Sequence, residues 1–156
     1  MVLDIAKDAQ TGMTEFDYKP CQFIRSYNPY PDIQPGEIEE AARLINQSRK
    51  PFILAGQGVI ISHAEKELSE LAEKADIPVG CTLLGLSAIP TGHPLYKGML
   101  GMHGSIAANI KTNECDLLIA IGMRFDDRVT GDLKQYARQA KVIHIDIDLS
   151  LIHISE

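Results

Sequence analysis

The sequence predicts an α/β fold, a parallel sheet with helices on both faces. After Pro35, short apolar runs bounded by Pro or Gly alternate with segments of helical periodicity. Strands that are separated by helices form βαβ units, and these units build parallel sheets. The chain has 156 residues, of which 45% are hydrophobic and 23% are charged. This length and balance are typical of one globular domain with a buried core.

Two helices are predicted in the first half of this region. The first runs from Pro35 to about Ser48, because four apolar residues recur at i, i+3, i+4 and i+7 and share one face, which we expect to be buried. These residues are Ile38, Ala41, Ala42 and Ile45. The second helix begins at an S-x-x-E capping box, Ser62 with Glu65, and ends before Pro78.

Four strands are predicted along the same region. They cover 52–55, 77–81, 116–121 and 141–147, and further helices lie near 104–113 and 131–139. The strand at 116–121 is apolar almost throughout, as expected of a central strand that is covered on both faces. The strand at 141–147 alternates apolar and polar residues, so one of its sides is polar. The carboxyl ends of these strands should meet at one edge, where open α/β sheets bind their ligands.

Residues 1–35 differ from the rest of the chain and predict a linker. Prolines at four positions exclude a long helix. Aromatic residues such as Phe16 and Tyr18 offer apolar surface, so we expect the linker to lie against the folded body.

Composition and charge exclude several classes of function. The formal net charge of −6 argues against a broad nucleic-acid-binding face, which needs clustered Lys and Arg. No stretch approaches the roughly 20 apolar residues of a membrane span. The N-terminus does not have the layout of a secretion signal, so we expect a cytoplasmic protein.

The cysteines and histidines are not spaced for metal binding. Cys21, Cys81 and Cys115 lie far apart and include no CxxC pair, so we expect reduced thiols. The five histidines lack the i, i+4 spacing of a helical zinc site. We predict no metal site in this chain.

Two glycine-containing loops have compositions that suit a ligand. Gly56-Gln57-Gly58 follows a predicted strand and could let the backbone approach a phosphate, although Ile61 stands where a dinucleotide fingerprint needs its third glycine. A tight turn between strand and helix is the alternative. The loop at 98–105, GMLGMHGS, suits packing against a flat ligand with Met side chains around a ring. There the alternative is a buried loop with a satisfied His103.

A third loop, GMRFDDRVTG at 122–131, carries four charged residues directly after an apolar strand. Arginines at the carboxyl end of a strand are well placed to bind phosphate in bidentate geometry, and neighbouring carboxylates can orient them. A solvated cluster of salt bridges is the alternative for these side chains.

Three motifs in this order, GMHG, GMRFDDRVTG and VIHIDID, resemble the middle domain of acetolactate (acetohydroxyacid) synthase. The resemblance runs from Leu3 to Asp148 and includes LDIAKDAQ, KPFILAGQGV and CTLLGLSAIP. It implies that residues 1–35 are the end of a preceding domain with a linker, and that 36–148 are an incomplete, Rossmann-like central domain. The tail LSLIHISE, 149–156, resembles a translated adapter, so we expect it to be non-native.

The resemblance also implies a function. The family uses thiamine diphosphate and Mg²⁺ to condense two 2-keto acids, pyruvate with pyruvate or 2-ketobutyrate, in branched-chain amino acid biosynthesis. Its middle domain holds FAD in an extended pose, as a structural group and not as an electron carrier. The positions that match the family's FAD contacts are Gly56, Gln57, Gly58, Thr82, Leu83, Leu100, Gly101, Met102, His103, Gly122, Arg124, Asp126, Arg128, Val129, Asp146 and Ile147.

The same resemblance predicts that this chain is catalytically inactive alone. The glutamate that activates thiamine diphosphate and the metal ligands belong to the family's other two domains, so no catalytic residue is expected here. Its expected partners are the rest of the large subunit, further copies of that subunit and a regulatory small subunit. Two alternatives are the central domain of another thiamine-diphosphate enzyme, of the glyoxylate carboligase or pyruvate oxidase type, and a free-standing nucleotide-binding module. The RFDDRVTG loop favours acetolactate synthase.

Overall fold

The computed structural model describes residues 6–13, 15–20, 34–132 and 134–147. Its body is a sheet of five parallel strands in the order β3-β2-β1-β4-β5. The strands are β1 Pro51–Ala55, β2 Val79–Cys81, β3 Tyr96–Met99, β4 Leu117–Ile121 and β5 Lys141–Ile145. The predicted fold class, a parallel sheet with helices, is therefore confirmed.

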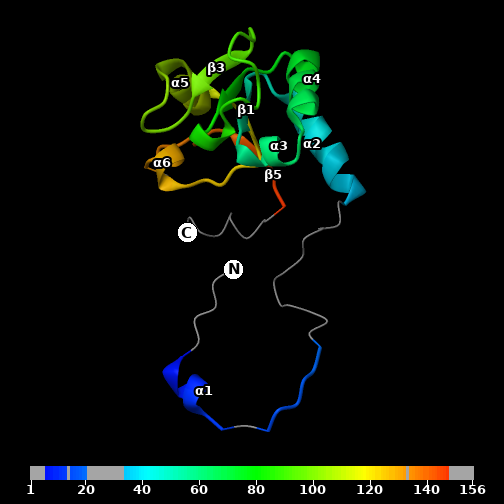
Figure 1. Ribbon diagram of the computed structural model, residues 1–156. Coiled ribbons are helices and arrows are strands. Elements are labelled where there is room, and N and C mark those ends of the chain that lie inside the picture. Colours follow the sequence, from blue (N-terminus) through cyan, green and yellow to red (C-terminus); the bar gives the residue numbers. More distant parts are fainter. Residues whose placement is uncertain (1–5, 14, 21–33, 133, 148–156) are drawn as a thin grey trace.

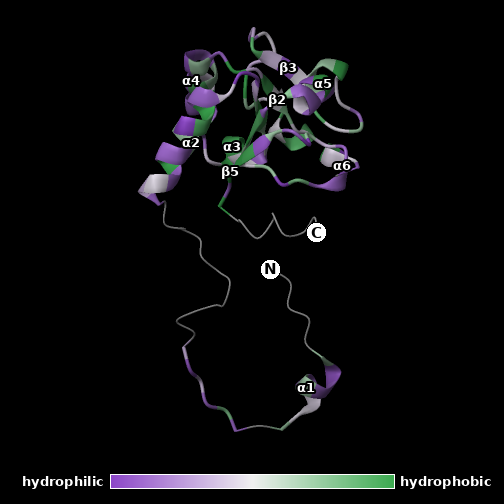
Figure 2. Ribbon diagram, turned by 180° about the vertical axis from the view of Figure 1, so that it is seen from behind, coloured by the Kyte–Doolittle hydropathy of each residue, from purple (hydrophilic) through white to green (hydrophobic). Residues whose placement is uncertain are grey.

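Helices cover both faces of the sheet (Figure 1). The helices on the body are α2 Pro35–Gln47, α3 Gln57–Ile61, α4 Glu65–Ala75, the 3₁₀ helix η1 Leu83–Gly85, α5 Ile106–Glu114 and α6 Asp127–Thr130. Helix α1 Lys7–Thr11 has no buried residue and takes no part in this cover. In both ribbon views α2 and α4 lie on one side of the strands, and α5 and α6 lie on the other (Figures 1 and 2).

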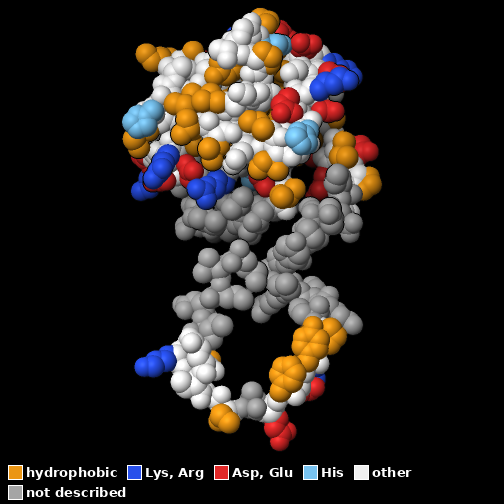
Figure 3. All heavy atoms as spheres, in the orientation of Figure 1, with side chains coloured by type: hydrophobic (Ala, Val, Ile, Leu, Met, Phe, Trp, Pro, Cys, Tyr) orange, Lys and Arg blue, Asp and Glu red, His pale blue; other side chains and the backbone are white. Residues whose placement is uncertain are grey.

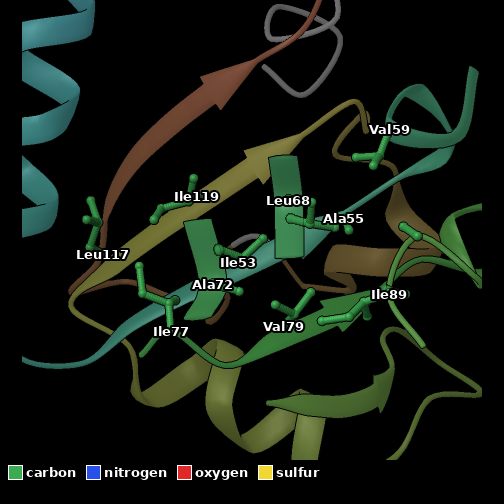
Figure 4. Close-up of a cluster of buried hydrophobic side chains, with 12 residues drawn as sticks. Ile53, Ala55, Val59, Leu68, Ala72, Ile77, Val79, Ile89, Leu117 and Ile119 are labelled. Atoms are coloured by element: carbon green, nitrogen blue, oxygen red, sulfur yellow. The ribbon is translucent and has the colours of Figure 1, made fainter. Parts of the chain in front are cut away.

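Alternate residues of the central strands supply two separate cores. On one face Ile53 and Ile119 pack with Leu68 of α4, all at most 4% exposed (Figure 4). On the other face Phe52 and Leu118 pack in a second buried cluster. Burial of one large aliphatic side chain contributes about 1.5 to 3 kcal/mol. Both sides of β1 and β4 are therefore apolar because both sides are covered. This is the arrangement that the apolar sequence at 116–121 predicted.

The edge strands follow weaker sequence patterns. β5 lies beside β4 at one edge, and its Val142 and Ile145 are 53% and 51% exposed. The other edge strand, β3, was not predicted. It has four half-buried residues and includes Gly98 at a φ of +106°, so it lacks the continuous apolar run that marks the central strands.

Two of the predicted helical features are wrong. The hydroxyl of Ser62 does not cap α4; Ser62 ends α3, and its hydroxyl donates to the carbonyl of Gly58 at 2.7 Å. The helix expected at 131–139 is not formed by the described residues of that range, which are a bend at 131–132 and turns at 134–139. Gly131 and Ala137 have φ values of +60° and +41°, and residues in this left-handed region interrupt a right-handed helix.

Packing of the N-terminal part also departs from the prediction. Ile38 is 59% exposed and Ala42 is exposed, whereas Ile45 packs against the core. The first turns of α2 extend past the sheet in Figure 1, so only its later turns find a surface to cover. Phe16 and Tyr18 are 91% and 74% exposed, so the predicted packing of the linker against the body is wrong at both residues.

Hydrogen bonds to Asp116 connect the start of β4 with the segment before β1. Its carboxylate accepts hydrogen bonds from the Ser48 hydroxyl, from the Arg49 amide at 2.8 Å and from the Lys50 amide at 2.9 Å. Partial burial raises the pKa of Asp116, but these hydrogen bonds together lower it below its ordinary value. The bonds therefore favour the ionised form.

We expect Asp116→Ala to lower the free energy of unfolding by about 1 to 2 kcal/mol at neutral pH. Because the folded-state pKa is depressed, this stabilisation is present above the ordinary carboxyl pKa and is lost as the pH falls through the folded value. Urea denaturation of wild type and variant at a series of pH values measures it. A difference that is unchanged at acidic pH would contradict the assignment, and Glu114→Ala is the exposed-carboxylate control.

Burial makes two of the three cysteines poor nucleophiles. Cys81 and Cys115 are free and buried, and burial raises the pKa of each thiol to about 11. Thiolate is therefore scarce at neutral pH. The prediction of reduced thiols is confirmed for these two, and Cys21 lies outside the described residues.

Candidate functional site

The loops that follow the five strands leave at a single edge of the sheet. Because every strand pair is parallel, all five carboxyl ends point the same way. The strand order also reverses between β1 and β4, since β2 and β3 lie on one side of β1 and β5 lies beyond β4. Open α/β sheets bind ligands outside such a reversal. Each residue matched to the family's FAD contacts lies at this edge, in or directly after one of these loops.

The loops after β1 and β4 meet backbone to backbone. The amide of Gly56 donates to the carbonyl of Ile121, and that of Gly58 to the carbonyl of Gly122, both at 2.9 Å. A Cβ atom at position 56 would lie 2.2 Å from the Gly122 carbonyl oxygen. These two amides are therefore already used within the protein. Glycine is needed here because the two loops approach each other closely. This agrees better with the alternative of a tight structural turn than with a loop that binds phosphate through its backbone.

The loop after β3 is held by Asn109, a residue that the sequence analysis did not single out. The Asn109 side chain accepts from the Gly101 amide and donates to the Gly101 carbonyl, each at 3.0 Å. Gly101 has a φ of +95°, which glycine adopts easily. The loop thereby exposes Met102 and His103 and buries Leu100 in the core. The alternative of a buried, satisfied His103 is wrong.

Asp126 organises the loop after β4. Its Oδ1 accepts from the amides of Arg128 and Val129 at 3.1 and 3.2 Å, and so caps α6. Its Oδ2 lies 3.5 Å from Nε of Arg124, whose side chain is 68% exposed. The Arg128 carbonyl accepts from the Met102 amide at 3.0 Å, which joins this loop to the one after β3.

The two arginine side chains in this loop are both exposed. Arg124 precedes α6 and Arg128 lies in it. In the region of α6, Figure 3 shows Lys and Arg side chains on the surface of the body. The Arg124–Asp126 pair is partly the solvated salt bridge of the alternative interpretation. An exposed pair of this kind is worth at most about 1 kcal/mol, so it leaves the guanidinium available to a stronger anion.

The remaining two loops contribute smaller features. The Thr82 hydroxyl accepts from the Gly85 amide at 3.1 Å and caps η1, while Leu83 is 67% exposed. After β5, the side chain of Asp146 is 11% exposed and Ile147 is 76% exposed.

A cavity of about 360 Å³ lies between α5 and the α6 loop. Leu100, Gly101, Met102, Arg128 and Val129 line it, and so do Asn109 and Tyr136. The Tyr136 hydroxyl is buried without a hydrogen-bond partner among the described residues. Burial raises the pKa of Tyr136, so it stays a neutral phenol. The sequence offered no spacing signal for Asn109 or Tyr136, because both act through contacts between distant segments.

In the described part of the chain, no cluster of three or more His, Cys, Asp or Glu residues is arranged to hold a metal ion. Within the same ranges, no helix combines the length and apolarity needed to cross a membrane.

The chain is similar to a family of known proteins. Residues 38–154 match the family model described as thiamine pyrophosphate enzyme, central domain. The probable acetolactate synthase large subunit of Methanocaldococcus jannaschii is 50% identical over 149 residues, which are 94% of this chain and 25% of that protein. The acetolactate synthase large subunit of Corynebacterium glutamicum is 44% identical over 148 residues, 95% of this chain and 24% of that protein.

A third relative, the acetolactate synthase large subunit of Cyanidium caldarium, is 43% identical over 154 residues, 95% of this chain and 26% of that protein. The chain thus spans about a quarter of the length of the curated relatives that it matches. Its similarity to them is spread over nearly all of its own length.

Proposed function

The chain belongs to the thiamine pyrophosphate enzyme central-domain family, and from that membership we propose that it is the FAD-binding central domain of an acetolactate synthase large subunit. The single observation that carries the FAD assignment is the pair of exposed arginines, Arg124 and Arg128, in the loop after β4. They stand at the edge where the carboxyl ends of all five strands meet.

The residues at this edge fit an extended, anionic dinucleotide. Guanidinium groups bind diphosphate through charge-assisted hydrogen bonds. Leu83 and Met102 are 67% and 75% exposed and can cover flat rings on either side. Neighbouring strands are about 4.8 Å apart, so the edge of five strands runs for roughly 19 Å, a length that suits an extended ligand.

The two arginines support the proposed FAD site more strongly than the glycines do. The amides of Gly56 and Gly58 already donate to backbone carbonyls, so they are not free to hold phosphate. Leu100 is buried and would offer only its backbone. FAD would serve here as a structural group that joins loops, and the residues proposed to contact it are those matched by the family resemblance.

The parent reaction is also a proposal. We infer that the complete protein is a transferase that condenses two 2-keto acids with thiamine diphosphate and Mg²⁺, and that these two cofactors bind outside this chain. The rest of the large subunit, further copies of it and a regulatory small subunit are the proposed partners, in the cytoplasm. Exposed Ile38, Val142 and Ile145 offer apolar surface for such contacts.

The direct test is titration of FAD against the purified chain. Quenching of flavin fluorescence that saturates with protein supports the assignment, and flavin fluorescence that stays constant at high protein concentration contradicts it for this chain. Unrelated α/β protein of similar charge is the control for adventitious quenching.

A second expectation concerns catalysis. The chain alone should form no acetolactate from pyruvate with thiamine diphosphate and Mg²⁺, because the activating carboxylate and the metal ligands are proposed to lie in other domains. A colorimetric acetoin assay against a blank without protein measures this. Turnover above the blank would overturn the division of roles between domains.

A further inference from the structure

The imidazole of His144 is nearly inaccessible to solvent, and the resemblance gives this residue no role. It lies on β5 opposite Ala120 of β4 and its side chain is 6% exposed. Its Nε2 lies 2.8 Å from the Met123 carbonyl oxygen. Its ring packs edge-on against Phe125, with 5.4 Å between ring centroids and an interplanar angle of 66°.

These contacts hold alternate residues of the loop after β4. Met123 is 5% exposed and Phe125 is half-buried, while Arg124 between them is exposed. The imidazole therefore fixes the two residues on either side of Arg124. Phe125 also packs edge-on against Tyr136, with 6.4 Å between centroids, so the inner side of the loop rests on two rings.

The hydrogen bond determines the tautomer of the ring. A carbonyl oxygen only accepts, so Nε2 of His144 carries the hydrogen. In the neutral ring Nδ1 would then be an acceptor, and it is buried without a partner among the described residues. A buried, unsatisfied acceptor lowers the stability of the fold. If position 144 only had to fill space, an apolar ring would therefore be more stable there. The donor to Met123 distinguishes histidine from such a ring.

His144 also reaches the loop after its own strand. Its Nε2 lies 3.9 Å from Oδ2 of Asp146, which is among the proposed FAD contacts. One imidazole thus adjoins the loop with Arg124 and the carboxylate after β5. We propose that His144 is a positioning residue for FAD: its Nε2–H holds the loop after β4 in the path that presents Arg124 to the ligand. This inference rests on the proposed function for its ligand, but the placement of the loop can be tested without FAD.

Two variants separate the hydrogen bond from the packing. His144→Phe keeps an aromatic ring against Phe125 and removes the donor. His144→Gln places an amide N–H at the same number of bonds from the backbone as Nε2. Ile119→Val, a conservative change in the other core, is the control for general loss of stability.

The first measurement is trypsin cleavage after Arg124, which reports how firmly the loop is held. Without FAD, His144→Phe should be cut at least about tenfold faster than wild type, while His144→Gln and Ile119→Val should stay within about threefold. FAD affinity should follow the same order, with about tenfold weaker binding for His144→Phe, the effect of losing one hydrogen bond of ordinary strength. Circular dichroism melting shows that each variant is folded under the assay conditions.

The outcomes are distinguishable. Cleavage of His144→Phe at the wild-type rate would overturn the positioning role, and so would equal acceleration in His144→Gln, because the donor would then not matter. If His144→Phe does not fold, the His144→Gln comparison alone decides, and fast cleavage there again overturns the role. If wild type does not bind FAD while the cleavage order holds, the proposed function fails and the loop-positioning role of His144 stands.

Discussion

The Gly122→Ala variant is expected to lose about 3 kcal/mol or more of unfolding free energy. Gly122 has a φ of +58°, and a Cβ atom there would lie 2.6 Å from Cα of Gly58 and 2.8 Å from the amide nitrogen of Val59. The left-handed conformation costs about 1 to 2 kcal/mol for alanine, and overpacking adds about 1 to 3 kcal/mol. Neither loop can withdraw easily, because Gly58 donates to the Gly122 carbonyl at 2.9 Å.

Urea denaturation measures this loss, and Gly131→Ala is the control for a positive φ without a close neighbour. Gly131 has nearly the same φ, +60°, but nothing lies within 4 Å of the Cβ atom that alanine would add. Its variant should lose only the backbone cost, about 1 to 3 kcal/mol for a residue held in a sparsely populated conformation. Equal losses at the two positions would show that the contact between the loops after β1 and β4 contributes little to stability.

Coverage of the strands explains which parts of the fold could be predicted from sequence. β1 and β4 are covered on both faces, so their apolar runs and their flanking Pro and Gly were sufficient signals. β3 was missed because an edge strand with half-buried residues does not need an apolar run. The helix expected at 131–139 depended on local pattern alone, whereas Gly131 and Ala137 have positive φ values and the Ala137 amide donates to Oδ1 of the distant Asn113 at 3.1 Å.

The meeting of the loops along one edge could be predicted from sequence, because the parallel topology alone decides it. Gly56, Arg124 and Asp146 lie at one edge because parallel strands end together. The sequence could not indicate that the Gly56 amide would be occupied by Ile121, or that Asn109 would bridge the turn at Gly101. Such partners are set by distances between segments that are far apart along the chain.

The largest functional effect is expected at Arg124. If the loop after β4 binds the FAD diphosphate, Arg124→Ala should weaken FAD binding about tenfold to 150-fold, since one charge-assisted hydrogen bond is worth about 1.5 to 3 kcal/mol. The side chain is 68% exposed, and its ion pair with Asp126, at 3.5 Å, is the one ion pair found for it among the described residues. Removal of this side chain leaves the cap on α6 intact, because Asp126 accepts from backbone amides. The fold should therefore persist while the affinity falls.

Fluorescence titration of FAD against wild type, Arg124→Ala and two control variants decides this. Lys141→Ala removes an exposed cation at the start of β5, and Arg49→Ala removes an exposed arginine before β1, both at the edge of the sheet away from the site. Each control changes the net charge by the same amount as Arg124→Ala, so a long-range electrostatic effect would weaken binding in all three. Higher salt should reduce the difference between wild type and Arg124→Ala, because screening weakens the exposed ion contact first. If Arg124→Ala binds FAD as tightly as the controls do, the loop after β4 does not hold the diphosphate, and the anionic part of the ligand must lie elsewhere along the edge.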